Sequence, residues 1–302
     1  MALKQVRANV NGVWYTATLN SSTGKYDVVA TAPNKSSYTQ EGHFYPITVE
    51  ATDQAGNVST VGADDTTLGS SLQLKVKEKV APVITITAPT ASQLLTNNKP
   101  TIKWKVTDED SGVNPDTIGL VIDSGSKITT GITKTEINGG YQCSYTPMAA
   151  LADGSHTIKF NASDNDGNVA ATKSVTFKVD TVPPTLSITS PSDGLVTNKS
   201  ACMVSGITND ETSSPVTVII QLNGGTAISV QVDSAGKFSK ELTLMEGSNT
   251  ITITAKDSAG KTTTITRNVT LDTVAPVIKA VAINPNPVDC GKSCIISIEV
   301  FD

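Results

Sequence analysis

The chain repeats itself, and this repetition limits its possible folds more than any other feature. A short alternating segment led by proline occurs three times, beginning at Pro82, Pro184 and Pro276. The copies are about 100 residues apart, the usual size of one β-sandwich domain. A chain of 302 residues is therefore long enough for about three such units.

A second repeated marker predicts hairpins. An alternating apolar strand that ends in Asp-x-x-Gly occurs at residues 47–57, 158–168 and 251–261. Apolar residues at every second position line one face of a strand, and the glycine allows the positive φ that a tight turn needs. No stretch keeps a 3.6-residue period, so the sequence predicts an all-β protein of several short strands, a sandwich or a barrel.

Three motifs resemble those of bacterial immunoglobulin-like repeats, which occur in surface adhesins and phage tail-associated proteins. They are an A-P-x-I-x-I start, an A-x-D-x-x-G-N hairpin and a V-D-T-x-x-P junction, found at 179–184 and, as L-D-T, at 271–276. The first junction, 77–82, lacks the Asp-Thr pair. The resemblance covers nearly the whole chain and implies tandem Greek-key immunoglobulin-like β-sandwiches in an elongated array. It says little about function, because this fold serves many roles.

With this fold, two domains would be complete and the two ends would each carry a split half-domain. An aspartate follows the leading proline by 26 residues at Asp108, Asp210 and Asp302 (108 − 82, 210 − 184 and 302 − 276), which marks the end of strand B each time. The two terminal pieces add up to one domain of ordinary length. The predicted division is 1–80 (strands C to G), 81–180, 181–272 and 273–302 (strands A and B).

We therefore expect the chain to associate with other copies head to tail. A sheet that lacks two strands exposes an apolar face and unpaired backbone groups, and strands from another copy satisfy both, as in donor-strand complementation. Such a contact closes into a ring or extends into a filament. The alternative is a segment cut from a longer array. The residues expected to be donated are Val277, Ile278, Val281, Ile295, Ile296, Ile298 and Val300.

Acidic residues gather in the loops and junctions at one end of each predicted sandwich. Converging carboxylates can bind Ca²⁺, which takes about six to eight oxygen ligands, and junction calcium is what the resemblance to adhesin repeats implies. The ordinary alternative is a set of Asx turns. Asp53 has fewer acidic neighbours, so a weaker site is expected there. The candidate calcium ligands are Glu78, Asp108, Asp110, Asp164, Asp166, Asp180, Asp210 and Asp257.

The sequence predicts no enzyme. His43 and His156 stand near the start of the predicted F strands, which is a structural placement that implies no nucleophile. Trp104 alternates with apolar neighbours and is expected in the core. Trp14 is either a core residue or a contact for the donated strands.

The four cysteines do not predict a disulfide framework. We expect Cys143 and Cys202 to be buried as small apolar residues. Cys290 and Cys294 could bridge a tight turn or remain two thiols. A single C-x-x-x-C without a second pair is a poor zinc site.

Composition narrows the class of partner. Charged residues make up 17% of the chain and its net charge is −5, which excludes a basic nucleic-acid surface. No run approaches the ~20 apolar residues of a membrane span, and no secretory signal is visible. We expect a structural protein of a phage or phage-like particle (tail, fibre or surface decoration), assembled in the host cytoplasm and bound to other copies and other virion or surface proteins. The alternatives are a stalk of a bacterial cell-surface adhesin and, with only 4% aromatic residues, an accessory carbohydrate-binding array.

Overall fold

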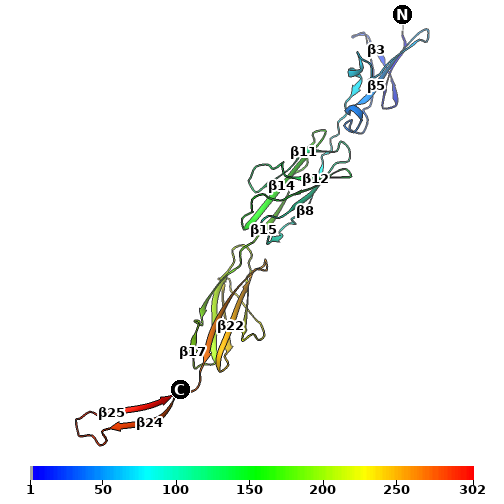
Figure 1. The fold of residues 1–302 in the computed structure, drawn as a ribbon. Helices are drawn as coiled ribbons and strands as arrows, with labels where there is room; N and C mark the ends of the chain where they lie inside the picture. The colour runs from blue at the N-terminus through cyan, green and yellow to red at the C-terminus, as the bar shows by residue number, and fades with distance from the viewer. Residues whose placement is uncertain (1–2) are drawn as a thin grey trace. The chain divides into compact units, whose positions relative to one another are not determined.

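A computed structural model describes residues 3–302. The chain is nearly all β, with 52% strand and 2% helix, and it forms two compact units, Met1–Val179 and Asp180–Asp302. Figure 1 labels the main strands of each part. The fold class predicted from the sequence, tandem immunoglobulin-like β-sandwiches, is confirmed.

Within the first unit, residues 81–179 form a two-sheet sandwich (Figure 1). Its core contains Trp104, Phe160 and Phe177, which are completely buried. One sheet has the order β12-β13-β10-β8 and the other the order β11-β14-β15-β9. The strands are β8 (Val83–Ala88), β9 (Leu94–Leu95), β10 (Ile102–Thr107), β11 (Val113–Ile122), β12 (Thr133–Ile137), β13 (Gly140–Tyr145), β14 (Gly154–Asp164) and β15 (Lys173–Val179).

Within the second unit, residues 181–272 form a second sandwich with the same plan (Figure 1). Val204, Ile251 and Ile253 are completely buried in its core. Its sheets have the orders β16-β18-β21 and β17-β23-β22-β19-β20. The strands are β16 (Thr185–Ser190), β17 (Leu195–Thr197), β18 (Ala201–Asn209), β19 (Thr217–Leu222), β20 (Ile228–Val230), β21 (Lys237–Thr243), β22 (Gly247–Lys256) and β23 (Thr262–Leu271).

In both sandwiches the first strand divides between the two sheets. β8 pairs antiparallel with β10, whereas the short β9 pairs parallel with β15 in the opposite sheet. β16 and β17 repeat this arrangement with β18 and β23. In immunoglobulin convention, β8 and β16 are therefore strand A, β10 and β18 are strand B, and β14 and β22 are strand F.

Residues 3–80 form one open sheet and a small hairpin. The sheet has the order β2-β1-β5-β6, with β7 also paired to β5, and β3 pairs with β4. Its central pair, β1 and β5, corresponds to strands C and F of the second sandwich, which are β19 and β22. Nothing in residues 3–80 corresponds to strands A and B. The elements are β1 (Leu3–Val10), β2 (Val13–Thr16), β3 (Thr18–Asn20), β4 (Lys25–Asp27), a 3₁₀ turn at Glu41–His43, β5 (Tyr45–Asp53), β6 (Val58–Val61), a 3₁₀ turn at Gly69–Leu72 and β7 (Gln73–Leu74).

The last strands form a two-stranded antiparallel hairpin, β24 (Val277–Asn284) and β25 (Ile295–Phe301) (Figure 1). Every residue of both strands is exposed. A two-stranded hairpin without a second layer has only marginal stability in water. This pair has the register of strands A and B: Val277 is opposite Phe301 as Thr185 is opposite Asn209.

Candidate functional site

Three buried carboxylates meet at one end of the second sandwich. Asp180 precedes β16, Asp210 follows β18 and Asp257 follows β22. One ligand oxygen from each residue lies within 4.8 Å of the others. We call this group the Asp180 trio. All three residues were predicted as metal ligands, although they are far apart in the sequence.

Each carboxylate of the Asp180 trio is fixed by backbone amides of its own loop. Asp180 Oδ1 accepts a hydrogen bond from the amide of Val182 at 3.2 Å. Asp210 Oδ1 accepts from the amide of Ser213 at 2.7 Å, and Asp257 Oδ1 accepts from the amide of Lys261 at 2.8 Å. The bond from Val182, two residues on, is the predicted Asx turn, whereas the bonds from Ser213 and Lys261 span three and four residues. All three orient the remaining oxygens.

Two oxygens of the trio lack any hydrogen bond. Asp180 is 0% exposed and Asp257 is 5% exposed, and within residues 3–302 neither Oδ2 atom has a partner. Buried polar groups of this kind are rare in native proteins. Hydrogen bonds within the loops account for the Oδ1 atoms but leave the Oδ2 atoms unexplained.

The arrangement suits a hard divalent cation. Two ionised carboxylates at this separation repel by about 3 kcal/mol at an effective dielectric constant of 20. Ca²⁺ takes about six to eight oxygens in flexible geometry, so three carboxylates supply part of the shell, and backbone oxygens or water supply the rest. The donor set therefore fits a calcium ion, with Asp180, Asp210 and Asp257 as its ligands.

The first sandwich carries the equivalent Glu78 trio, formed by Glu78, Asp108 and Asp164. Asp108 and Asp164 are buried, and Glu78 is half-buried. Asp164 is the best satisfied of the three, since its Oδ1 accepts from the amide of Asn168 and its Oδ2 from the Asn168 side chain, at 2.7 and 2.6 Å. This trio has no buried oxygen without a partner among the described residues, so it provides weaker support for a cation.

Two predicted ligands have other roles. The carboxylate of Asp110 accepts from the amide of Ser36 at 3.1 and 3.2 Å. The carboxylate of Asp166 accepts from the amide of Glu78 at 3.0 Å. Both side chains therefore tie segments of the first unit together and lie outside the Glu78 trio.

Asp53 occupies the same place on β5 that Asp164 occupies on β14. Its Oδ1 and Oδ2 accept from the amide and the side chain of Asn57, both at 2.8 Å. These hydrogen bonds, the Asn57 side chain's first, lower the pKa of Asp53. Asp53 belongs to no group of three or more possible metal ligands in the described chain.

The terminal hairpin presents one apolar face. Residues directly opposite in an antiparallel pair point to the same side, and the pairing places Ile278 with Val300, Val281 with Ile298, and Ile283 with Ile296. The opposite face is mixed: it carries Ser297 and Glu299 together with Val277, Ala280, Ala282, Ile295 and Phe301, so the predicted donated residues Val277 and Ile295 lie on this face, apart from the other five. All six side chains of the apolar face are between 44% and 63% exposed. At the equivalent positions of the sandwiches, strand-B residues such as Trp104 and Val204 are 0% exposed.

The open sheet of residues 3–80 has a matching apolar face. Val6 is opposite Ala51, Ala8 is opposite Val49 and Val10 is opposite Ile47. In the second sandwich the equivalent strand-F residues are completely buried, but Ile47, Val49 and Ala51 are only half-buried. Trp14, whose role was left open, lies on the other face of this sheet, over the guanidinium of Arg7 at 4.3 Å.

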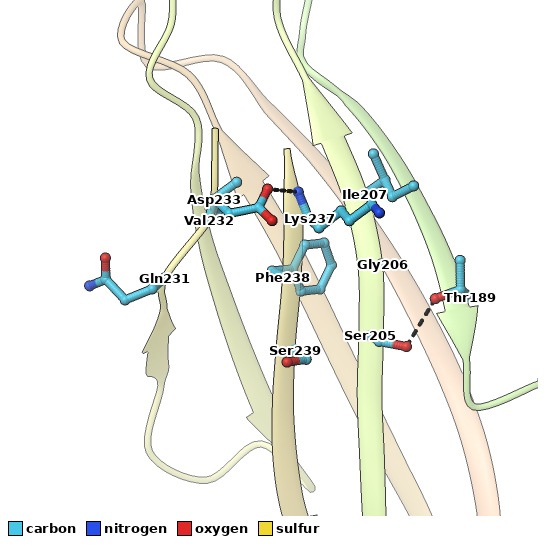
Figure 2. Close-up of a pocket in the computed structure, with 10 residues that line it drawn as sticks. All are labelled: Thr189, Ser205, Gly206, Ile207, Gln231, Val232, Asp233, Lys237, Phe238 and Ser239. Carbon is cyan, nitrogen blue, oxygen red and sulfur yellow. Dashed lines mark hydrogen bonds between the residues drawn. The ribbon is translucent and has the colours of Figure 1, made fainter. Parts of the chain in front are cut away.

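A groove of about 760 Å³ lies beside β21 (Figure 2). Phe238 packs onto the backbone of Gly206, where a Cβ would come within 2.6 Å of the ring. Part of the polar lining is already paired: Thr189 Oγ1 is 2.9 Å from Ser205 Oγ, and Asp233 accepts from the amide of Lys237. The groove forms because β21 is the last strand of its sheet in the described chain, whereas β12 covers the equivalent β13.

Neither histidine is paired with a nucleophile in the described hydrogen bonds. His156 Nδ1 lies 2.9 Å from Asp123 Oδ2, and Nε2 lies 2.7 Å from the carbonyl oxygen of Ala152. Burial disfavours the charged ring, but the hydrogen bonds to Ala152 and Asp123 outweigh it and raise the pKa of His156. His43 was expected to be equivalent, but it ends a 3₁₀ turn before β5 and bonds to the carbonyl of Tyr38.

All four cysteines are free and lie in the described part of the chain. Cys143 and Cys202 are buried as predicted, and burial raises the pKa of the Cys143 thiol to about 11. Cys290 and Cys294 are exposed in the loop of the terminal hairpin. They are present as two thiols, one of the two expected states.

Two sandwiches of one plan, each with an acidic trio, define an array of immunoglobulin-like domains. Comparison with known protein families identifies these domains. Residues 79–181 match the family Bacterial Ig-like domain, and residues 184–273 match the family Glucodextranase, domain B. The chain thus contains bacterial immunoglobulin-like domains in tandem.

One curated relative and several solved structures share parts of the chain. Bacillopeptidase F of Bacillus subtilis (strain 168) is 28% identical over 198 residues, which are 66% of this chain but only 12% of that protein. The fibronectin(III)-like modules of Clostridium thermocellum CbhA are 17% identical, with a TM-score of 0.33, over 63% of this chain and 94% of theirs. Sidekick-1 immunoglobulin domains 1–4 are 11% identical, with a TM-score of 0.40, over 89% of this chain and 67% of theirs. Within residues 3–302, no helix is long and apolar enough to cross a membrane.

Proposed function

We propose that the chain is a non-enzymatic structural array whose copies join head to tail by strand donation. The terminal hairpin of one copy would supply strands A and B to the open sheet of the next. One observation carries this proposal: the six-residue apolar face of the hairpin is exposed at positions that the sandwiches bury on strand B and bury or half-bury on strand A, and the open sheet lacks the strands that would cover it. Burying these six side chains contributes roughly 1 kcal/mol or more each.

Equivalence with the second sandwich gives the register of the proposed contact. There Ser205 is opposite Ser239 and Gly206 is opposite Phe238. The segments Gly236-Lys237-Phe238 and Gly24-Lys25-Tyr26 match, so Tyr26 takes the place of Phe238. Ile298 of the donor would then lie opposite Tyr26, which is 38% exposed in the single chain, whereas Phe238 is 4% exposed.

Calcium at the Asp180 and Glu78 trios would stiffen the array by fixing the loops that hold these carboxylates. The setting that we propose is a phage or phage-like particle, where copies would also contact other virion proteins. The match to the family Bacterial Ig-like domain, whose members are typically extracellular or surface domains, favours a second setting: a stalk on a bacterial cell surface. A stalk would not need strand exchange between copies.

Cysteine crosslinking tests strand donation in full-length chains. Two variants are mixed, Asp27→Cys and Ser297→Cys, each with Cys290→Ser and Cys294→Ser. Opposed residues have Cα atoms about 4.5–5.5 Å apart, within reach of a disulfide. We expect a disulfide-linked dimer of twice the chain mass on a non-reducing gel.

The matched control replaces Asp27→Cys by Ser22→Cys, which lies in the turn of the same hairpin and outside the proposed register. This pair should crosslink poorly. No crosslink with Asp27→Cys, or equal crosslinking with both partners, would contradict strand donation. A chain that stays monomeric would then support the stalk.

A further inference from the structure

The apolar row of β25 continues one position before the strand begins. Ile296, Ile298 and Val300 lie on the apolar face of the terminal hairpin. Cys294 precedes Ile296 by two residues, so in an extended chain its side chain lies on the same face. The Cys294 thiol is exposed. Cys294 therefore belongs to the surface that strand donation would bury.

Both sandwiches bury the residue that stands eight positions before the aspartate after strand B. This residue is Pro100 in the first sandwich and Cys202 in the second (108 − 100 and 210 − 202), and both are buried. Counted in the same way from the end of β25, the equivalent residue is Cys294 (302 − 294). A donated Cys294 would thus take the place of Cys202, which is opposite Leu242 of the neighbouring strand.

The second exposed cysteine of the hairpin stands at a position that both sandwiches leave in solvent. Cys290 lies twelve residues before the same aspartate (302 − 290), and its equivalents are Thr96 and Asn198 (108 − 96 and 210 − 198). Both equivalents are exposed. In a completed domain, the thiol of Cys294 would lie in the core and the thiol of Cys290 would lie outside it.

In the single chain, the two thiols share one exposed loop. The amide of Lys292 donates to the carbonyl oxygen of Asp289 at 3.0 Å, and this turn, which contains Cys290, reverses the chain before Cys294. An exposed loop of this kind can bring residues four positions apart to the Cα separation below about 7 Å that a disulfide requires. The other two cysteines of the described chain are buried, so this loop carries the accessible thiols.

We infer that Cys290 and Cys294 form a reversible disulfide site, and that the reduced hairpin is donated to the next copy whereas the oxidised hairpin is not. This inference rests on the proposed function. The disulfide holds the sulfur of Cys294 beside Cys290, at a position outside the sandwich. Donation places the same sulfur inside the sandwich, so the two states exclude each other.

The oxidant is a small-molecule disulfide such as oxidised glutathione. One cysteine loses its proton, its thiolate attacks a glutathione sulfur, and one glutathione leaves and takes up a proton. The second cysteine attacks the mixed disulfide in the same way and releases the second glutathione. Two protein thiols are oxidised to one S–S bond, and one glutathione disulfide is reduced to two thiols. A reducing compartment keeps the pair reduced, so assembly is expected there.

Sedimentation velocity of the full chain over a concentration series tests the inference. Chains are oxidised with glutathione disulfide, freed of the reagent, and shown by mass to have lost two hydrogen atoms without gaining a glutathione. The disulfide should weaken association about fivefold or more, because one small apolar side chain is withheld from the core. Dithiothreitol should restore association. Cys290→Ser is the matched control: it keeps Cys294, and its adduct-free chains should associate like the reduced native chain after the same treatment.

Alkylation with iodoacetamide supplies a second readout on reduced chains. At a concentration where about nine chains in ten are associated, Cys294 should react about tenfold more slowly than in dilute solution, since only an undonated hairpin exposes its sulfur. Cys290 should react at the same rate in both samples. Peptide masses after digestion report the two sites separately.

The outcomes separate this inference from the function on which it rests. Equal association of oxidised and reduced chains, together with the crosslink between Asp27→Cys and Ser297→Cys, would overturn the disulfide site and leave strand donation intact, because the crosslinking variants lack both loop cysteines. Equal alkylation of Cys290 and Cys294 in associated chains, or equal weakening of Cys290→Ser by the oxidant, would also overturn the site. Absence of both association and crosslink would overturn strand donation itself.

Discussion

His156 is held at both ring nitrogens by acceptors, the carboxylate of Asp123 and the carbonyl of Ala152. Only a doubly protonated ring donates to both, so folding favours the charged form. The folded-state pKa lies above the unfolded value, and the stabilisation is therefore fully present below the unfolded pKa. It is lost as the pH rises through the folded-state pKa.

We predict that the first sandwich is more stable at pH 5.5 than at pH 8.5, by about 1 kcal/mol or less because Asp123 is 44% exposed. Urea unfolding followed by the fluorescence of buried Trp104 measures this difference. Asp123→Asn should reduce this difference, because it removes the carboxylate charge that favours the charged ring. The fold should tolerate the change, since asparagine adopts the φ of +53° at this position and can still accept from Thr157. An unchanged pH dependence in Asp123→Asn would contradict the assignment.

At the residue scale, sequence reasoning found the carboxylates but not their roles. Asp108, Asp164, Asp180, Asp210 and Asp257 each stand at a strand end, so the repeat places them correctly. Their neighbours Asp110 and Asp166 have the same loop chemistry, and only the tertiary hydrogen bonds to Ser36 and Glu78 distinguish them. The orphaned Oδ2 atoms have no sequence signature, because burial arises from the packing of distant loops.

At the scale of elements, the proposed register brings opposite charges together. Ile207 is opposite Lys237 in the second sandwich. The equivalent pair between copies is Glu299 of the donor and Lys25 of the acceptor. Directly opposed charges of unlike sign contribute about 0.2–1 kcal/mol, and like charges destabilise the pair.

We predict that Glu299→Lys weakens association by about two- to fivefold, which is this energy expressed as an equilibrium constant. Lys25→Glu in the same chain should restore it, since every junction then has the reversed pair. Sedimentation velocity at moderate salt measures both. Failure of the double variant to recover would argue against this register.

Elements with strong alternation were predictable, and the strand-A and strand-B character of β24 and β25 follows from the repeated proline-to-aspartate spacing. The sheet that each edge strand joins was not predictable. Residues 133–137 form β12 and cover β13, whereas the corresponding part of the second sandwich, β20, pairs with β19. Both segments are short alternating runs, so the choice of sheet depends on packing that propensity does not encode.

At the scale of the molecule, the two sandwiches have separate cores and separate trios. Substitutions far apart with no shared partner act independently. A change in the Asp180 trio should therefore affect one unfolding transition and leave the other unchanged.

We predict that 1 mM calcium raises the unfolding temperature of the second sandwich by about 5 °C, taking linkage of roughly 1.4 kcal/mol in a domain of about 100 residues. Asp257→Asn should abolish this shift and should raise the transition in EDTA, because it removes one repelling charge. Differential scanning calorimetry follows both transitions, with Glu241→Gln as a charge-matched control. A calcium shift that persists in Asp257→Asn would contradict a cation site there.

The uncovered edge of β21 has a consequence for fidelity. A terminal hairpin that pairs with a neighbouring copy could also pair with the wrong strand edge. The unpaired backbone amides along the edge of β21 offer such an edge. Lys237 and Lys240 project from this strand, both exposed, and charged lysines on a border strand discourage unwanted pairing. The tyrosine-bearing acceptor at residues 25–27 has one lysine, which Glu299 can neutralise. The placement of these charges would thus favour pairing of the hairpin with residues 25–27 of the next copy over pairing with β21.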